Sequence, residues 1–452
     1  MANGYQSAAE LRKEISSSDS SARRFISVLF DEGTFLETGT YTKNAGGNNN
    51  FEGVITGCGA VDGRLVFTFI QDYSNGRAAF TSASAKKISA LYDKAIRAKA
   101  PVVGVYTSAG AKLSEGIDAV SGYGAVIARI SEAKSLIPQI SVVAGACGGA
   151  AAAAASMADF VVADNQKGEL YILPENEATM KQGVRADLYA EGTEALALRT
   201  RELLNYLPGN REEGTVYTLA PDDINTPSEG IEALASSDSD IRELISALSD
   251  NGVFFELFSD FDKEMVCGFS AINGRIVGVT ANQPIEKKGA LTANAARKAA
   301  KFINFLGRFG IPLLTLVNTI GFGGENCGCY AGALSELCFA YTSCKSAKIT
   351  VVTGKAYGSA FTLLGSKQLG ADMVFALDSA VISVMAPETA VEFVWDNRVK
   401  AAADPVTARA TLRDEWIASS ASPLAAARLG DIDDVIEYSE LRQRVAAAFE
   451  IF

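Results

Sequence analysis

The sequence contains no histidine among its 452 residues. Histidine is the usual acid–base side chain near neutral pH and the usual partner of a serine or cysteine nucleophile. Its absence excludes Ser-His-Asp and Cys-His mechanisms, and also the zinc sites that depend on imidazole. Any chemistry must therefore use backbone amides, carboxylates, Lys, Tyr, Ser or a bound cofactor.

Regularly spaced cysteines and an export signal are also missing. The seven cysteines are an odd number without zinc-ribbon spacing, so we expect reduced thiols and no metal site. The first residues are polar and acidic, unlike a signal peptide, which favours a cytoplasmic protein. The uncharged stretch 136–158 is long enough to span a membrane. Its proline, glycines and many alanines instead favour a strand, a turn and a helix.

Basic residues are fewer than acidic residues, which gives a net charge of −12. A chain this acidic is not expected to bind nucleic acid as its main partner. An anionic small ligand remains compatible with it, since a local cluster of Lys or Arg and helix N-termini can override the global sign.

An internal duplication dominates the sequence. Val61–Val66 reappears as Ile272–Val277, and Gly110 matches Gly321 at the same offset of 211 (62 to 273, 110 to 321). Further on, 142–150 matches 351–359 at an offset of 209 (142 to 351). Two domains are therefore predicted, 1–212 and 213–452.

Each copy alternates predicted strands with predicted helices, which favours an α/β fold with crossover connections. The region 208–251 is rich in Asp, Ser, Gly and Pro and is interpreted as a linker, and 394–452 as a helical tail. In the first copy we expect strands at 53–58, 65–71, 102–107, 140–144 and 160–163, and helices at 84–98, 117–133 and 150–157. In the second copy we expect strands at 276–281, 313–318, 349–353 and 373–376, and helices at 293–309 and 330–343.

The glycine-rich turns carry the chemical signal. A strand that ends in Gly148-Gly149-Ala150 and continues at once as a helix leaves backbone N–H groups unpaired at the helix N-terminus. Glycine allows a ligand to approach the backbone closely, and the helix dipole favours negative charge there. Such donors suit a thioester oxygen that becomes an enolate, or another oxyanion. Close packing of helix on strand is the alternative explanation for the small residues.

Four segments resemble the biotin-dependent acyl-CoA carboxyltransferase family. They are 108–116, 137–150, 276–284 and 351–360. The likeness runs from about Phe30 to Asn397. The chain is similar to the propionyl-CoA carboxylase β subunits and to the α subunits of methylmalonyl-CoA and glutaconyl-CoA decarboxylases.

The resemblance implies an α/β fold of two tandem crotonase-like (ClpP/crotonase) domains related by internal duplication. The first would bind the acyl-CoA thioester and the second carboxybiotin, and a carboxyl group would move between biotin and the acyl α-carbon through an enolate. Biotin would sit on a separate biotin carboxyl carrier protein, which a biotin carboxylase subunit charges. A homo-oligomer with inter-subunit active sites, a hexamer, is also implied.

The resemblance carries over to individual positions. The oxyanion donors fall on Gly149 and Ala150, and on Ser359 and Ala360. Substrate contacts fall on Gly110, Ala111, Gly148, Gly358, Thr362, Gly321 and Phe322. Biotin contacts fall on Tyr357, Gly358 and Ser359, and no metal is implied.

Several positions depart from the family pattern. Ala150 and Ser359 replace glycines, which adds a Cβ and keeps the N–H. Lys112 replaces an arginine and loses its bidentate fork. Asn318-Thr319-Ile320 replaces an Asp-x-Pro stretch. Thr362 stands where relatives of the propionyl type carry an Asp that lines the acyl pocket, so the acyl group is left open.

Other functions and residues remain as alternatives. The same reaction run backwards would make the chain the α subunit of a sodium-translocating decarboxylase with a membrane partner subunit. A biotin-independent hydratase or isomerase would need a positioned carboxylate such as Glu115 or Glu388, for which ion pairing is the simpler role. A scaffold without activity would fit the altered glycines. Two further motifs are a biotin-attachment sequence, Met180-Lys181, and the lysine pairs 86–87 and 287–288, which could meet CoA phosphates or lie on solvated faces.

Overall fold

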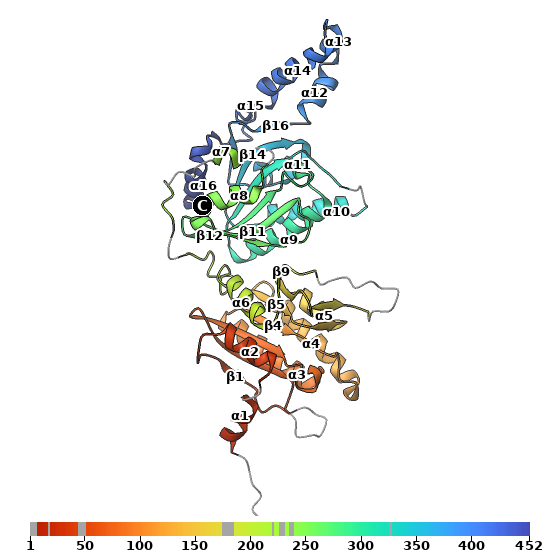
Figure 1. Cartoon of the computed structure of the whole chain (residues 1–452), viewed down its shortest axis with the longest axis vertical. Helices are drawn as coiled ribbons and strands as arrows, with labels where there is room; N and C mark the ends of the chain where they lie inside the picture. Colours follow the sequence, from red (N-terminus) through yellow and green to blue (C-terminus); the bar gives the residue numbers. More distant parts are fainter. Residues whose placement is uncertain are drawn as a thin grey trace, which may run out of the picture. The chain divides into compact units, whose positions relative to one another are not determined.

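The computed structural model describes residues 7–16, 19–43, 51–173, 185–218, 221–225, 231–234, 239–324 and 328–452. The chain divides into two compact units, Met1–Glu213 and Gly214–Phe452 (Figure 1). The division lies one residue after the boundary expected from the repeat. Each unit has its own sheets and is described by itself.

The first unit contains a seven-stranded sheet in the order β1-β2-β3-β4-β5-β7-β9 and a two-stranded sheet, β6-β8. Strands β3, β4, β5, β7 and β9 run parallel, and the helices connect them. Its strands are β1 (Leu36–Thr38), β2 (Val54–Val61), β3 (Arg64–Gln71), β4 (Val102–Tyr106), β5 (Gln139–Val143), β6 (Ala146–Gly148), β7 (Phe160–Asp164), β8 (Glu169–Tyr171) and β9 (Leu188–Ala190). Its helices are α1 (Ala8–Ser16), α2 (Ser21–Leu29), α3 (Ser82–Ala98), α4 (Ile117–Ala133), α5 (Ala150–Ser156) and α6 (Thr193–Leu204), with 3-10 turns η1 (Gly76–Ala78) and η2 (Leu113–Glu115).

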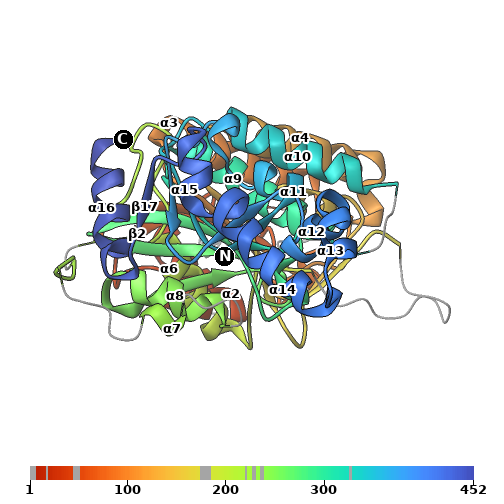
Figure 2. The ribbon, with the colours of Figure 1, turned by 90° about the horizontal axis from the view of Figure 1, so that it is seen from above.

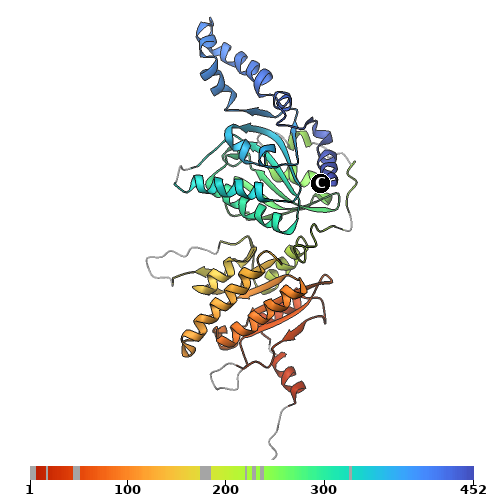
Figure 3. The same ribbon diagram turned by 180° about the vertical axis from the view of Figure 1, so that it is seen from behind.

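The second unit repeats this plan in an eight-stranded sheet, β10-β11-β12-β13-β14-β15-β17, with β16 beside β14. Helices α9 and α10 run side by side (Figures 2 and 3). Its strands are β10 (Phe254–Leu257), β11 (Met265–Ile272), β12 (Arg275–Asn282), β13 (Leu313–Thr319), β14 (Lys348–Tyr357), β15 (Met373–Leu377), β16 (Val381–Ser383) and β17 (Asp434–Ile436). Its helices are α7 (Ile231–Leu234), α8 (Ile241–Leu248), α9 (Ala293–Phe309), α10 (Tyr330–Ser343), α11 (Gly358–Leu363), α12 (Pro387–Val394), α13 (Asp396–Ala401), α14 (Pro405–Trp416), α15 (Pro423–Arg428) and α16 (Leu441–Ile451), with η3 (Asp250–Gly252), η4 (Lys287–Gly289), η5 (Lys367–Leu369), the π turn η6 (Ile417–Ala421) and η7 (Tyr438–Glu440).

The two copies share details that apolar packing alone does not require. The β2–β3 hairpin turns at Asp62 and Gly63, with φ of 48° and 77°, and the β11–β12 hairpin turns at Asn273 and Gly274, with φ of 51° and 77°. Both pairs suit the left-handed turn that matches strand twist. The hairpin predicted for the first copy is therefore confirmed, and the second copy repeats it.

Most predicted elements are present, and helices 117–133, 293–309 and 330–343 have the predicted bounds. Two predictions were wrong. The presumed linker contains α8, whose Ile241, Leu244, Ile245 and Leu248 are buried in the core of the second unit. The helical tail also contributes strand β17, which pairs with β15.

Two smaller expectations were also tested. Cys329 is disulfide-bonded, so the expectation of reduced thiols fails there, whereas Cys58, Cys147, Cys267, Cys338 and Cys344 are free. Within the ranges listed above, no helix is both long enough and apolar enough to cross a membrane.

Candidate active site

A turn directly after β4, at residues 108–111, presents an unused backbone donor in the first unit. Phe80 N–H donates to Gly110 O at 2.8 Å, and Lys112 N–H donates to Phe80 O at 2.8 Å. These bonds fix the peptides on either side of Ala111. No described residue accepts a hydrogen bond from Ala111 N–H. Because Ala111 is only partly buried, this donor is open to a ligand.

A second donor stands at the start of α5. Ser108 N–H donates to Ala146 O at 2.9 Å, which places β6 and the turn after it beside the 108–111 turn. No side chain caps α5, and Ala150 is its first residue and is exposed. Its N–H therefore belongs to the unpaired group that every helix N-terminus carries.

Gly149 forms the bend between these elements. Its φ of 58° and ψ of −127° are accessible to glycine and strained for other residues. Its N–H donates to Tyr171 O at 2.8 Å, across the pairing of β6 with β8. The donor expected from Gly149 is thus used within the protein, and the open donors here are Ala111 and Ala150.

The second unit builds the same turn after β13. Leu291 N–H donates to Gly321 O at 3.0 Å, and Gly323 N–H donates to Leu291 O at 3.2 Å. Phe322 lies between these bonds, as Ala111 does in the first unit, and no described residue accepts from its N–H. The side chain of Phe322 is 45% exposed, so the turn faces solvent.

A hydroxyl braces each turn from inside. Gly110 N–H donates to Ser108 Oγ at 3.0 Å, and Gly321 N–H donates to Thr319 Oγ1 at 3.2 Å. The two residue pairs are separated by the same 211 positions (108 to 319, 110 to 321). The duplication thus preserved the bonding of the turn as well as its glycine.

Helix α11 supplies the second donor of the second unit. Gly358 has a φ of 65°, and a Cβ placed on Gly321 would lie 3.7 Å from Tyr357 O, so the two turns are neighbours. The N–H groups of Ser359 and Ala360 lie in the first turn of α11, which no side chain caps. Ser359 is exposed, whereas the Ala360 side chain is fully buried.

The offset of 209 (149 to 358) pairs the two left-handed glycines, Gly149 and Gly358. It therefore pairs Ala150 with Ser359. The family resemblance gave Gly149 with Ala150 as one donor pair and Ser359 with Ala360 as the other. In this register the second pair lies one position later than the first. The structural equivalence favours Ala150 and Ser359 as the matching donors.

A carboxylate anchors the helix next to each turn. Thr81 caps α3 and donates to Glu52 Oε2 at 2.8 Å, one residue after Phe80. Thr292 caps α9 and donates to Asp262 at 3.1 Å, one residue after Leu291. Burial, with a contribution from the Glu264 carboxylate, raises the pKa of Asp262 to about 6.

Each unit also buries one lysine near this anchor. Lys87 Nζ donates to Val54 O, and Lys298 Nζ donates to Phe258 O at 3.0 Å and to Phe261 O at 2.8 Å. Burial lowers the pKa of Lys87 to about 8 and also lowers the pKa of Lys298. Lys87 is thus held inside the fold, which leaves Lys86 as the exposed member of its pair.

The remaining predicted residues occupy different settings. Gly148 lies under the Tyr171 ring, since a Cβ there would approach the ring to 2.5 Å. Thr362 is exposed on α11. Tyr357 is 9% exposed, and burial raises its pKa to about 12, so its hydroxyl is neutral at pH 7.

The carboxylates and lysines considered as alternatives are placed as follows. Glu115 Oε2 accepts the N–H of Ser82 at 2.8 Å, so Glu115 supports the first turn of α3. Lys287 forms an ion pair with Glu264. Lys288 stands in η4 with a φ of 55°, and Glu388 is exposed at the start of α12. The Met180-Lys181 motif lies outside the described residues.

Arg77 was not singled out in the sequence. Its carbonyl accepts the N–H of Ala109 at 3.1 Å, which fixes it beside the 108–111 turn. Its side chain is exposed, and no described residue forms a salt bridge with it. The signal that could have found it is the repeat, which pairs Arg77 with Lys288 (77 to 288), both at positive φ.

Comparisons with known proteins show the family to which the chain belongs. A family model described as the carboxyl transferase domain matches residues 14–180 and 173–452. The methylmalonyl-CoA decarboxylase subunit alpha of Propionigenium modestum is 34% identical, over 98% of this chain and 92% of that protein. The propionyl-CoA carboxylase carboxyltransferase subunit of Haloferax mediterranei is 33% identical, over 94% and 89%.

Solved structures give the same result. The transcarboxylase 12S hexamer, with methylmalonyl-coenzyme A and methylmalonic acid bound, matches with a TM-score of 0.89 and 30% identity, over 97% of this chain and 90% of that one. A single-chain long-chain acyl-CoA carboxylase matches in fold alone, with a TM-score of 0.76 and 20% identity, over 94% of this chain and 45% of that one. The fold is thus that of two tandem crotonase-like domains related by internal duplication.

Proposed function

Since the chain belongs to the carboxyl transferase family and is an acyl-CoA carboxyltransferase, we propose that it moves a carboxyl group between biotin on a separate carrier protein and the α-carbon of a short acyl-CoA. The first unit would hold the thioester, and the second would hold the biotin ring. The division of roles between 1–212 and 213–452 is part of this proposal.

One observation carries the proposal. Each unit places two open backbone donors on neighbouring turns, Ala111 with Ala150 and Phe322 with Ser359. A pair of N–H groups stabilises an oxygen that gains negative charge, and it does so without titrating. Two such pairs are what a reaction between two carbonyl compounds, a thioester and a cyclic urea, requires.

In the first unit, the thioester oxygen would accept from Ala111 and Ala150 as the enolate forms. Gly149 supplies the left-handed bend that exposes Ala150, and Gly110 has open space beside it. Gly148 makes room for the Tyr171 ring. Arg77, exposed beside the 108–111 turn, is the cation best placed for the CoA phosphates.

In the second unit, the residues fit a neutral urea ring. The donors of Phe322, Ser359 and Ala360 would hold the ring oxygen, and Gly321 and Gly358 leave room for it. Tyr357 stays protonated, so it can bind the ring as a neutral group. When bound, biotin supplies a labile carboxyl group and a basic nitrogen, which explains how a chain without histidine can perform proton abstraction.

The acyl group and the partners complete the proposal. Thr362 of α11 is exposed and stands where relatives of the propionyl type carry an Asp, so the proposal extends to short acyl groups in general. We expect a biotin carboxyl carrier protein and a biotin carboxylase subunit as partners. We also expect a homo-oligomer, because Phe393 of α12, Val406 of α14 and Leu429 just after α15 are 78%, 74% and 81% exposed. The likeness to the transcarboxylase 12S hexamer supports a hexamer.

The test is carboxyl transfer from N-carboxybiotin to acetyl-, propionyl-, butyryl- and crotonyl-CoA by the full chain. We expect transfer to a short saturated acyl-CoA and a loss of transfer in Gly149→Val, with the fold intact by circular dichroism. Retained transfer in Gly149→Val would show that the first donor pair is misplaced. Absence of transfer with every acyl-CoA would support a scaffold without activity.

The reverse reaction is the second candidate, and the likeness to a decarboxylase α subunit favours it. As part of a sodium-translocating decarboxylase, the chain would transfer the carboxyl group of methylmalonyl- or glutaconyl-CoA to biotin on a membrane-bound assembly. ATP-independent, avidin-sensitive decarboxylation of these thioesters by the purified assembly would select this direction. Hydration of crotonyl-CoA that biotin does not affect and Glu115→Gln abolishes would instead indicate a hydratase.

A further inference from the structure

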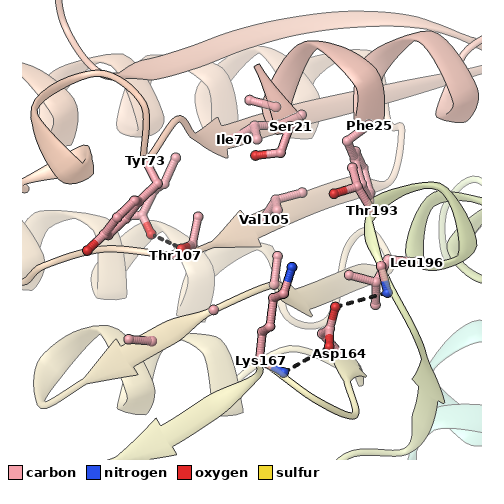
Figure 4. Close-up of a pocket in the computed structure, with 16 residues that line it drawn as sticks. Ser21, Phe25, Ile70, Tyr73, Val105, Thr107, Asp164, Lys167, Thr193 and Leu196 are labelled. Atoms are coloured by element: carbon pink, nitrogen blue, oxygen red, sulfur yellow. Dashed lines mark hydrogen bonds between the residues drawn. The ribbon is translucent and has the colours of Figure 1, made fainter. Parts of the chain in front are cut away.

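The first unit contains a pocket that the proposed function does not use. It lies at the carboxyl ends of β3, β4 and β7, under the first turns of α2 and α6, and it encloses about 320 Å³ (Figure 4). The 108–111 turn follows β4, and the turn before α5 follows β6. The pocket is lined by Thr107 and Ala146, next to these turns, and by neither Ala111 nor Ala150. The pocket therefore adjoins the candidate active site and is lined by different residues.

One part of the pocket wall is apolar. Phe25 of α2, Ile70 of β3, Val105 of β4 and Leu196 of α6 line it, and Phe25 and Ile70 are each 1% exposed to solvent. An apolar wall of this kind can bind a hydrocarbon group, and polar contacts with a ligand must then come from the other part of the wall.

The other part of the wall carries hydrogen-bond donors. Lys167 points into the pocket in Figure 4, and no described residue accepts from its ammonium group. Gln71 is only 3% exposed; its Oε1 accepts Thr107 N–H at 3.0 Å, and its Nε2 has no acceptor among the described residues. Gln71 Nε2 can therefore donate to a ligand or to water in the pocket.

Helix α6 adds a third source of donors. It has 12 residues, its N-cap Gly192 provides no side-chain cap, and Thr193 in its first turn lines the pocket. Its free N–H groups and its dipole favour a negative charge at this end. Lys167, Gln71 and α6 therefore all favour an anion.

A carboxylate in the same wall, Asp164, is already bound by backbone donors of the protein. Asp164 Oδ1 accepts the N–H groups of Gln166 and Lys167, each at 2.9 Å, and Asp164 Oδ2 accepts Gly192 N–H at 3.0 Å. These three bonds hold the Asp164 carboxylate as part of the scaffold. A cationic ligand would have to compete with them.

The second unit shows that the fold does not need this pocket. Strand pairing places Leu377 where the first unit has Asp164, since Asp164 pairs with the third residue of β9 and Leu377 with the third residue of β17. The repeat likewise pairs Ile70 with Ala281 and Val105 with Leu316 (70 to 281, 105 to 316). Leu377, Ala281 and Leu316 are buried in one apolar cluster.

We propose that the pocket behind the donor turns of the first unit binds a free short-chain organic carboxylate, separately from the acyl-CoA thioester. The carboxylate group accepts from Lys167 Nζ, Gln71 Nε2 and the first turn of α6, and the hydrocarbon chain lies against Phe25, Ile70 and Val105. A single ammonium and a half-apolar wall select a monoanion with a small hydrocarbon body over a phosphate.

The experiment measures binding of sodium butyrate to the full chain by ligand-observed NMR, without CoA or biotin. We expect saturable binding of butyrate and none of n-butanol or n-butylammonium, which share its chain but not its charge. Lys167→Met should weaken butyrate binding about tenfold or more, because a hydrogen bond to a charged group is lost. Thr193→Val should weaken it less.

Lys94→Met is the matched control, because Lys94 is an exposed lysine of the same unit outside this pocket. It should leave butyrate binding unchanged, and Lys167→Arg should restore part of it. Equal binding of butyrate by Lys167→Met and by the parent chain, or binding of butanol as tight as that of butyrate, would overturn the proposal. So would an absence of saturable butyrate binding. None of these readouts depends on carboxyl transfer.

Discussion

The two units share the backbone of the site and differ in what lies behind it. Both carry a hydroxyl-braced turn, a left-handed glycine and an uncapped helix, at positions that the duplication relates. Behind the turns, the first unit has a pocket with one apolar and one polar wall, whereas the second buries Ala281, Leu316 and Leu377 in an apolar cluster. The comparison teaches that the duplication preserved the main-chain geometry of the turns while the side chains behind them diverged.

The anchors of the turns show the same separation on a smaller scale. Glu52 holds Thr81 in the first unit, whereas Asp262 holds Thr292 in the second. The two carboxylates are 210 residues apart (52 to 262), whereas the threonines are 211 apart (81 to 292). The same contact is thus made from different sequence positions, which points to selection for the contact.

The largest expected effect tests whether the second unit is apolar at the position where the first unit has the polar wall of its pocket. Leu377→Asp places a carboxylate in an apolar core without the three N–H donors that Asp164 has. We expect the free energy of unfolding to fall by about 4 kcal/mol or more. Urea denaturation followed by circular dichroism measures it. Leu377→Met is the control, and equal tolerance of both changes would contradict the comparison.

The next effect tests the equivalence of the two donor positions. Ala150→Pro and Ser359→Pro each delete one N–H, and proline is tolerated in the first turn of a helix. Each change should slow carboxyl transfer by about 100-fold or more, which corresponds to about 3 kcal/mol.

The two proline variants should fail in different half-reactions. Ala150→Pro should block exchange of the acyl-CoA α-proton, and Ser359→Pro should block decarboxylation of carboxybiotin. Ala150→Ser and Ser359→Ala keep both N–H groups and should remain active. A loss of the same half-reaction in both proline variants would refute the division of roles.

A third prediction concerns the buried lysines and pH. The pKa of Lys87 is about 8 in the folded chain and 10.5 as a free side chain. Between these values the unfolded chain binds the proton and the folded chain does not, so stability should rise as pH rises from 8 to 10.5. The gain is about 2–3 kcal/mol. Urea denaturation at several pH values measures it.

Lys87→Met should flatten this rise, and Lys298→Met is the matched change in the second unit. Because the pKa of Lys298 is also lowered by burial, it should act in the same direction. A rise in stability that persists unchanged in both variants would assign it to other groups.

The smallest predicted effect separates the two anchors. Glu52→Gln should slow only the acyl-CoA half-reaction, and Asp262→Asn should slow only the biotin half-reaction. Each change should slow its half-reaction about fivefold, because each removes one hydrogen bond of roughly 1 kcal/mol. Because the pKa of Asp262 is about 6, Asp262 is already protonated below that pH. The effect of Asp262→Asn should therefore shrink below pH 6, which rate measurements from pH 5 to 8 would detect.

The sequence predicted those parts of the fold in which a local pattern determines the structure. Helices α4, α9 and α10 begin and end where the apolar spacing indicated. Helix α8 was missed because its surroundings are polar and its apolar stripe spans only 241–248. Its role depends on strands far along the chain, which periodicity does not reveal.

The candidate site divides in the same way. The glycines and the helix starts could be found from the sequence, because the duplication repeats them. The use of the Gly149 N–H by Tyr171 could not, since it arises from the long-range pairing of β6 with β8. The pocket around Lys167 and Gln71 is likewise assembled from segments that are distant in sequence.

The open donors at Ala111, Ala150, Phe322 and Ser359 are all main-chain groups. Every amino acid except proline carries such a group, so single substitutions at these positions rarely delete a donor. A site of this kind is robust to mutation, and its neighbouring side chains are free to drift toward new acyl groups. Ala150 and Ser359, which the duplication pairs, differ in side chain and share the N–H, which is an instance of that freedom.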